Sequence, residues 1–482
     1  MPSILGANSV TGDFITNSLC FNDGDSARLA RAQANGNQDK WTWSGWVKRS
    51  NTGAAQCLFA TTDGSATSFD AKFDGSDRID VYNYLGGGFG ARLITNRLFR
   101  DVAAWYHIVI VYDSGNGTEA NRLRIYVNGT EESSFSTTNY PSQNEDSDLN
   151  VSGSDIEIGR QANGSQFFDG YMAEMFLLDG QAKAPTDFAE TDSNGVWVPK
   201  EYTGGSFGTN GFHLQFKQTG TSANAAGIGA DTSGNGNHFT PTNLAATDIG
   251  IDTPQNNYCT INSVYADDGN NMVAADFSEG NRKQLTTVDG WKFGRGTFLL
   301  EAGKWYVEVK MTEAGSGQAG NFGIVPSQGG VTLGNSDDND VFEGLRVGFS
   351  SSDTILQKLD TGSGSNIFTD FASGNTAMLA IDLDNDKIWI GKEGTWYNNN
   401  NASTTLSPSN HDIALPTVSL GWVFGLGMSR NGSDNITFEY NWGNPAHAIS
   451  SGNSDADGHG NFEFAVPSGF FAVNSKNLAE YG

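Results

Sequence analysis

The chain has 482 residues, of which 37% are hydrophobic and only 17% charged, and its formal net charge is −27. Thirty Phe and eleven Trp exclude a disordered chain, because disordered sequences lack large apolar side chains. The strong acidity argues against anionic partners, so we expect neither nucleic-acid binding nor attraction to an anionic lipid surface.

The cysteines, the N-terminal residues and the apolar runs indicate where the protein is made and whether disulfides, metals or a membrane are involved. Cys20, Cys57 and Cys259 show neither a disulfide framework nor metal-ligand spacing, so three buried thiols are predicted. The first residues lack the basic and apolar regions of a signal peptide. No apolar run approaches about 18 residues, so no membrane insertion is predicted. We therefore expect synthesis in a cytosol without a standard export signal.

In chain order, the first stretch is residues 1–17, in which a few apolar residues are scattered among small polar ones. We predict an arm that docks to another component, and an edge strand or a frayed terminus explains the pattern equally well. Residues 18–190 then predict a β-sandwich of short β-branched or aromatic strands. Within it, the spacing of Trp41, Trp43 and Val47 places them on one face.

Two turn signals fall inside this first sandwich. Asn128-Gly129 separates two strand-like runs and predicts a two-residue hairpin. The glycine-rich stretch 86–90 lacks the Lys and Ser or Thr of a phosphate loop and is predicted to be a loop.

The second half of the chain changes in character. Residues 191–275 are rich in Gly, Asn and Ser and show little periodicity, so they are predicted to be a connector. Residues 276–482 predict a second sandwich, in which Asp384–Asp386 forms a tight turn between antiparallel strands. The predicted fold class is all-β, with two antiparallel β-sandwich domains and a loop-rich connector.

Several segments of the first domain resemble, in order, the strands of laminin G-like domains. They are Trp43–Trp46, Trp105–Asp113, Leu123–Gly129, Ile156–Arg160 and Phe168–Phe176. Laminin G-like domains are a branch of the concanavalin A-like lectin fold. The resemblance therefore implies a jelly-roll sandwich, and it does not specify a ligand.

The last domain resembles a SPRY domain, which is also a β-sandwich. The resemblance rests on Gly303–Val309, Arg346–Ser350, Ile381–Ile390 and Gly394–Trp396. It implies a second antiparallel jelly-roll at residues 276–482.

The connector carries a third resemblance. Asp231–Asn243 and Asp252–Asn262 resemble a junction of tailed-phage virion proteins, where it joins a lectin-like sandwich to a SPRY-like one. Gly6–Gly12 and Asn17–Asn22 resemble the start of such proteins. A virion protein needs no export signal because lysis releases it, and the resemblance implies a location on the virion exterior.

A search for catalytic and metal-binding patterns gives little. Glu174 and Glu308 lack the partner acids that glycoside hydrolysis requires. The six histidines show no His-x-x-x-His spacing, and no Gly-x-Ser-x-Gly sequence occurs. Acidic turns such as Asn22–Asp25 offer oxygens to Ca²⁺, although a solvated turn explains each of them better. We therefore predict no catalytic residue, no metal ligand and no cofactor, with a structural Ca²⁺ left open.

Exposed aromatic rings are the remaining candidates for ligand contact, because a ring can cover the apolar face of a pyranose. The aromatic residues that flank turn-rich segments are Tyr82, Tyr84, Trp396 and Tyr397. Ordinary packing is the alternative explanation at each position.

Together these observations predict a non-enzymatic virion structural protein, a tail fibre or a capsid fibre or decoration, that binds host-surface glycans or proteins. Residues 1–17 would bind other virion proteins, and a homo-oligomer, with a trimer favoured, is expected. A polysaccharide depolymerase on the same fold and a purely structural capsid or tail cement protein are the alternatives. The ligand, the copy number and a head or tail location stay open.

Overall fold

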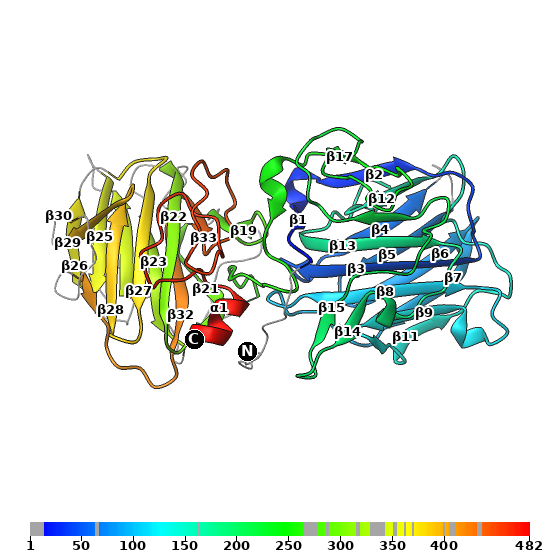
Figure 1. Cartoon of the computed structure of the whole chain (residues 1–482), viewed down its shortest axis with the longest axis horizontal. Helices are drawn as coiled ribbons and strands as arrows, with labels where there is room; N and C mark the ends of the chain where they lie inside the picture. Colours follow the sequence, from blue (N-terminus) through cyan, green and yellow to red (C-terminus); the bar gives the residue numbers. More distant parts are fainter. Residues whose placement is uncertain are drawn as a thin grey trace. The chain divides into compact units, whose positions relative to one another are not determined.

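The computed structural model describes residues 14–62, 67–161, 163–264, 277–285, 289–314, 319–327, 343–349, 354–360, 363–368, 371–398, 401–403, 411–430 and 436–482. The chain divides into two compact units, Val10–Gln255 and Asn256–Gly482. Each is built of antiparallel strands (Figure 1), which confirms the all-β prediction. The described residues contain one α-helix, α1 (Ser475–Tyr481). Among these residues, no helix is both long enough and apolar enough to span a bilayer.

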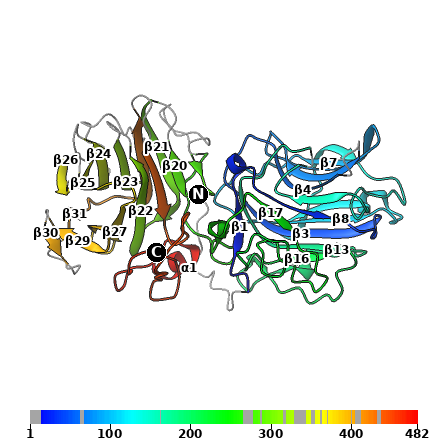
Figure 2. The ribbon, with the colours of Figure 1, turned by 90° about the horizontal axis from the view of Figure 1, so that it is seen from above.

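The first unit is a sandwich of two sheets, which Figure 2 shows as two layers. The layer named here the β3 sheet has, in spatial order, β10 (Thr130–Glu131), β9 (Leu123–Val127), β8 (Tyr106–Asp113), β3 (Lys40–Arg49), β13 (Gly170–Asp179), β1 (Ser18–Phe21) and β18 (Ile249–Gly250), with β16 (Phe212–Leu214) paired to β13. The layer named the β5 sheet has β11 (Phe135–Asn139), β7 (Gly88–Thr95), β6 (Ile79–Leu85), β5 (Ser68–Phe73), β4 (Gln56–Thr62), β12 (Asp155–Ile158), β2 (Arg28–Ala32) and β17 (Thr240–Thr242). A separate ladder joins β14 (Ala189–Thr191) to β15 (Trp197–Pro199).

Alternation along the strands buries one face of each sheet between the two layers. Trp41, Trp43 and Val47 of β3 are fully buried in the common core, as their spacing predicted. The predicted hairpin is also present between β9 and β10. Its turn residues Asn128 and Gly129 have φ of 48° and 79°, which are the positive values that a two-residue hairpin turn of this twist requires.

Parts of the predicted connector and arm lie in this first unit. From residues 191–275, β16 pairs with β13, β17 with β2 and β18 with β1. From residues 1–17, Ile15 is buried against Trp46 and Tyr171. Residues 1–13 lie outside the described residues.

A stretch of chain, residues 184–207, covers the outer face of the β3 sheet, which is the face that points away from the β5 sheet. We call it the cover segment. Its Phe188, Tyr202 and Phe207 pack against Val109 and Phe176 on that face. The β3 sheet is therefore buried on both sides, and it offers no wide surface to a ligand.

His107 of β8 lies under the cover segment and is neutral. Its Nδ1 accepts a hydrogen bond from Trp197 Nε1 at 3.1 Å. Because an indole nitrogen can only donate, Nε2 carries the imidazole proton and donates it to Ser44 Oγ at 2.9 Å. Burial lowers the pKa of His107 to about 3.

Protonation of His107 makes the first unit sensitive to acid. Below about pH 6.5 the unfolded chain binds a proton at this residue that the folded chain rejects, so the free energy of unfolding falls as the pH falls. The contribution is about 2 kcal/mol at most between pH 6.5 and pH 5. His107→Gln keeps one donor and one acceptor, and it should reduce this slope in urea unfolding followed by tryptophan fluorescence at both pH values. Identical slopes in the two proteins would contradict the assignment.

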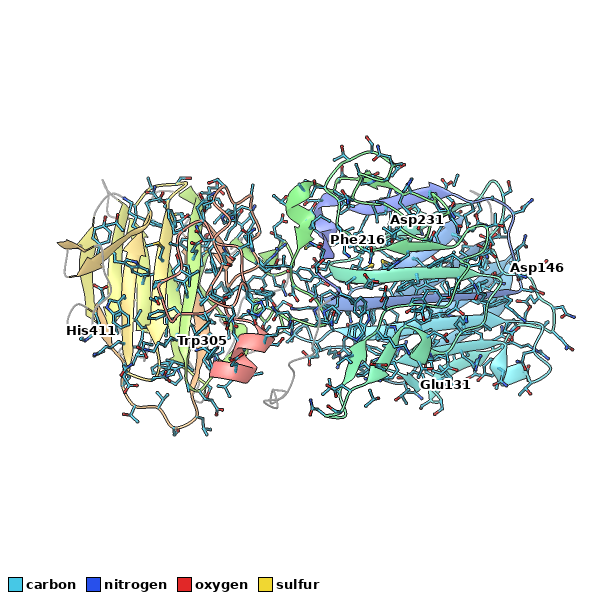
Figure 3. The ribbon with its side chains drawn as sticks, in the orientation of Figure 1. Glu131, Asp146, Phe216, Asp231, Trp305 and His411 are labelled. Atoms are coloured by element: carbon cyan, nitrogen blue, oxygen red, sulfur yellow. The ribbon has the colours of Figure 1, made fainter. Side chains whose placement is uncertain are left out.

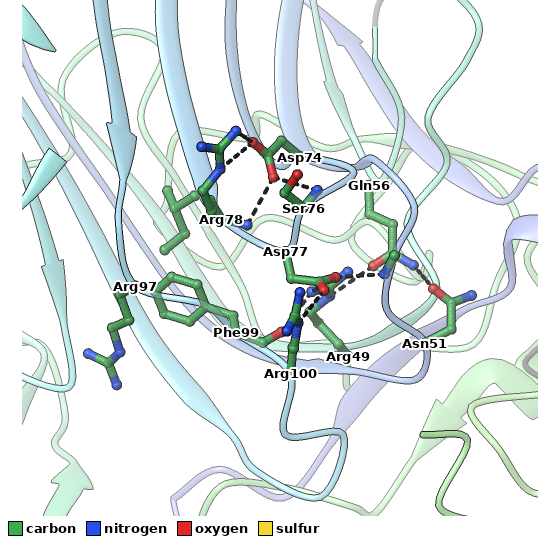
Figure 4. Close-up of polar contacts among 12 residues, drawn as sticks. Arg49, Asn51, Gln56, Asp74, Ser76, Asp77, Arg78, Arg97, Phe99 and Arg100 are labelled. Carbon is green, nitrogen blue, oxygen red and sulfur yellow. Dashed lines mark hydrogen bonds and ion pairs between the residues drawn. The ribbon is translucent and has the colours of Figure 1, made fainter. Parts of the chain in front are cut away.

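A buried ion pair joins the two sheets at one end of the sandwich (Figure 4). Arg49, at the end of β3, donates from Nη1 to Asp77 Oδ1 at 3.1 Å and to the Phe99 carbonyl at 2.7 Å. Asp77 lies in the turn between β5 and β6, and it also pairs with Arg100 at 2.8 Å. Burial acts to raise the pKa of Asp77, but the Gly53 N–H and the two arginines outweigh it, and the pKa is lowered.

Asp77→Asn should leave the Arg49 guanidinium buried without a counter-charge and lower the free energy of unfolding by about 3 kcal/mol at pH 7. Since folding lowers the pKa of Asp77, this contribution is complete above about pH 5 and is lost progressively as the pH falls toward the lowered pKa of the folded state. The difference between wild type and variant should therefore narrow as the pH falls below about 4. Glu132→Gln, which breaks the more exposed pair with Arg97, is the control and should cost less than about 1 kcal/mol. Equal losses in the two variants would show that burial of the pair is not decisive.

The second unit is also a two-layer sandwich. The layer named the β22 sheet has β19 (Phe277–Ser278), β20 (Lys283–Leu285), β33 (Ile436–Asn441), β22 (Lys304–Ala314), β27 (Thr376–Asp382), β28 (Lys387–Lys392), β29 (Thr395–Asn398) and β30 (Asn401–Ser403), with β31 (Ile413–Ala414) paired to β28. The other layer has β21 (Gly290–Leu300), β32 (Trp422–Arg430), β23 (Ala319–Pro326), β24 (Glu343–Phe349), β25 (Thr354–Asp360) and β26 (Ser363–Phe368). Trp305, which Figure 3 labels, is fully buried in its core.

C-terminal residues close the outer face of the β22 sheet. Glu308 of β22 points to this face, and its carboxylate accepts hydrogen bonds from the N–H groups of Glu463 at 3.0 Å and Phe464 at 2.8 Å. The Tyr306 hydroxyl donates to it at 3.0 Å. Burial raises the pKa of Glu308, and these hydrogen bonds only partly offset that effect. Glu308 thus fastens the C-terminal segment to the sheet.

Candidate functional site

The outer face of the β5 sheet carries a row of polar and aromatic side chains. Strand register places Asp70, Tyr82 and Arg92 side by side across β5, β6 and β7. Their chain neighbours Ala71 and Val81 are buried in the core, so the row points away from the β3 sheet. This face is the candidate site.

Three rings at the end of the β6–β7 hairpin form what we call the aromatic cluster, Tyr82, Tyr84 and Phe89. The Phe89 ring packs edge-on against each tyrosine at 5.3 Å between centroids. Phe89 is 44% exposed, Tyr84 is half-buried and Tyr82 is buried. Large apolar rings are normally covered, so an exposed ring braced by two others is suited to contact with an apolar ligand surface.

Arg92 lies beside the aromatic cluster in a fixed position. Its Nε and Nη2 donate to the two oxygens of Asp80 at 3.0 Å and 2.8 Å. Its guanidinium carbon lies 4.5 Å from the Phe89 ring centroid. The hydrogen bonds to Asp80 raise the pKa of Arg92 further. Arg92 can therefore donate from its remaining N–H groups to a ligand with little loss of side-chain conformational entropy, because its guanidinium is already held in one position.

Beside the aromatic cluster, the loop that follows β12 contacts part of this face, at Tyr82 and Lys72. Gln161 Nε2 donates to the Tyr82 hydroxyl at 2.8 Å, and Lys72 Nζ donates to Gln166 Oε1 at 3.1 Å. Burial, followed by the nearby Asp70 carboxylate, raises the pKa of Tyr82, so its phenol stays protonated. Burial also raises the pKa of Asp70, although Ser68 and Tyr82 partly offset it.

Two carboxylates on this face could suggest glycoside cleavage. Asp70 and Glu157 lie in one row with β4 between them, so their Cα atoms are roughly 9.5 Å apart. The Asp70 side chain is completely buried, however, and both oxygens of Glu157 are taken by Arg160. Neither carboxylate is placed to reach a glycosidic bond, so the arrangement offers contacts rather than acid–base chemistry.

The four predicted ligand contacts fall into two groups. Tyr82 and Tyr84 come together in the aromatic cluster. Trp396 and Tyr397 lie on β29 in the second unit, where Trp396 is buried beside Tyr306 and Tyr397 packs against the core. These last two rings are turned inward and offer little surface to a ligand.

The sequence reasoning missed Phe89, Arg92 and Asp80. The stretch 86–90, predicted to be a loop, is instead a hairpin: Gly86 and Gly87, with φ of 56° and 121°, form the turn, and β7 begins at Gly88. Gly-Gly between two alternating strands was the available signal, and it would have placed Phe89 opposite Tyr84.

Other candidate sites are structural. The three cysteines are buried thiols, as predicted. Glu174, at a β-bulge of β13 with φ of 46°, bonds to His213 Nε2 at 2.5 Å. Within the described part of the chain, no group of three or more His, Cys, Asp or Glu side chains is arranged to hold a metal ion.

Comparisons with known proteins agree with this fold. Residues 21–184 match the Laminin_G_3 family model, described as the concanavalin A-like lectin/glucanases superfamily. Residues 21–184 are therefore similar to concanavalin A-like, laminin G-type domains, as the resemblance implied. No curated protein matches the chain.

Three solved structures illustrate the likeness. A putative carbohydrate binding protein from Bacteroides ovatus ATCC 8483 is 15% identical, with 47% of this chain and 58% of that chain covered and a TM-score of 0.31. Domains LG4-5 of the mouse laminin alpha1 chain are 8% identical, with 89% and 90% covered and a TM-score of 0.29. The SPRY domain of human HERC1 is 11% identical, with 33% and 87% covered and a TM-score of 0.22.

Proposed function

We propose that this protein binds glycans on the outer face of the β5 sheet, through the aromatic cluster and Arg92. The observation that carries the proposal is the exposed Phe89 ring, which two tyrosines and an arginine hold in one position. A pyranose has an apolar face that can lie on such a ring and hydroxyl groups that can accept from the guanidinium. The lectin-like fold of the first unit supports the same conclusion.

Removal of the exposed ring should abolish most of the binding. Phe89→Ala is expected to weaken the affinity of the full-length chain for its glycan by about tenfold or more, since an aromatic ring that the ligand buries dominates a small interface. Titration calorimetry, with the glycan chosen from a polysaccharide array, gives the measurement. Leu98→Ala is the matched control, because Leu98 is 45% exposed and is no part of the aromatic cluster. If both variants bind as wild type does, the site is elsewhere.

The setting we propose is the exterior of a tailed-phage virion, as a fibre or decoration that contacts the host surface. The phage-like junction in residues 231–262 and the two rigid sandwiches support it. Many copies on one particle would turn weak single contacts into firm attachment. Residues 1–17 would dock the protein to other virion components, and a trimer would be the assembly.

Competition with intact particles tests this setting. The purified chain should reduce adsorption of its phage to host cells, and the Phe89→Ala protein should do so at least about tenfold less well. A chain that lacks residues 1–13 should still bind glycan but no longer enter particles. The deletion stops there because Ile15 is part of the core cluster around Trp46. Unchanged adsorption at saturating wild-type protein would favour a purely structural cement role.

A further inference from the structure

We infer that the ligand is a neutral polysaccharide and not an acidic or sulfated one, an inference that rests on the proposed glycan site. The argument comes from the charges around the aromatic cluster. A site for carboxylate or sulfate needs a cation without a counter-charge, whereas a site for hydroxyl groups needs donors and acceptors with no excess charge.

The strands of the β5 sheet carry no excess of basic residues. Its eight strands carry four basic residues and four acidic ones, namely Arg28, Arg31, Lys72 and Arg92 against Asp70, Asp80, Asp155 and Glu157. All eight strands are fully described, so the count is complete for them. Arg28 and Arg31 lie on β2, four strands away from β6. The strands around the aromatic cluster, β5, β6 and β7, carry two residues of each sign, so no excess of positive charge surrounds it.

The cations nearest to the aromatic cluster already have a carboxylate beside them. Asp80 binds Arg92 through both of its oxygens, and the Asp80 side chain is only 2% exposed. Lys72 lies opposite Asp80 in the strand register and two residues from Asp70 on the same strand face. Arg160, which follows β12, is paired with Glu157. An anionic ligand would have to compete with a buried carboxylate for its arginine.

A neutral sugar does not have to compete with Asp80 for the Arg92 guanidinium. Asp80 occupies Nε and Nη2 of Arg92, and no hydrogen bond within the described residues occupies Nη1. Nη1 can therefore donate to a sugar hydroxyl while the Phe89 ring covers the apolar face of the same residue. Asp80 acts as a positioning residue that fixes the guanidinium and cancels its charge.

Binding of two panels of polymers by the full-length chain tests the inference. The neutral panel is laminarin, yeast mannan and galactan, and the anionic panel is alginate, polygalacturonate and dextran sulfate. The expected result is binding to a neutral polymer, with an affinity that changes by less than about twofold between about 50 and about 500 mM NaCl. Tighter binding to an anionic polymer that weakens steeply with salt would overturn the inference and leave the proposed site intact. Binding to neither panel, or binding that Phe89→Ala leaves unchanged, would overturn the proposed function itself.

Asp80→Asn supplies an independent readout, because it removes the counter-charge and frees the Arg92 guanidinium. Binding to the anionic panel should rise by about tenfold, and binding to the neutral polymer should fall. Asp113→Asn, which removes the same charge from a pair with Lys40 on β8 and β3, is the control and should change neither. A fall in anionic binding in Asp80→Asn would contradict the inference. If circular dichroism shows that Asp80→Asn is unfolded, Arg92→Gln replaces it. Binding to the neutral polymer should then fall by less than about tenfold, whereas tight binding of the wild type to an anionic polymer that Arg92→Gln abolishes would overturn the inference.

Discussion

Every β-strand sends alternate side chains to opposite faces of its sheet, and a sandwich buries only one face of each layer. The outer face of each sheet in this protein must therefore be covered by other residues or be exposed to solvent. The cover segment closes the outer face of the β3 sheet, and C-terminal residues bound to Glu308 close that of the β22 sheet. On the β5 sheet, ion pairs and an aromatic cluster occupy the outer face, with the Phe89 ring still open to solvent.

Local patterns were enough to predict several of the strands. The period of two at Trp41, Trp43 and Val47 and the Asn128-Gly129 turn each depend on a few neighbouring residues, and the structure has both features. The cover segment could not be predicted in this way. The cover segment is held in place by contacts of Phe188 and Tyr202 with strands that are distant in the sequence. Such contacts produce no hydrophobic periodicity in the local sequence.

The residues of the candidate site also fall into two groups, those that local sequence patterns could indicate and those that only the strand register brings together. Tyr82 and Tyr84 could be named from the sequence because aromatic residues near turns are visible there. The same signal also pointed to Trp396, whose ring the second unit buries. Arg92 and Asp80 are twelve residues apart and become neighbours only through the β6–β7 register, which depends on the Gly-Gly turn. Their charge balance, on which the ligand class rests, could not be seen before that register was known.

The cover segment also has a consequence for synthesis. Val109 and Val111 leave the ribosome well before Phe207, because about 95 residues separate Val111 from Phe207. At ordinary elongation rates this separation corresponds to about 5 to 20 s. During that interval the apolar outer side of β8 lacks the residues that later bury it. A nascent chain in this state is a natural client for a holdase chaperone, and slower translation of residues 114–207 would lengthen its exposure to aggregation.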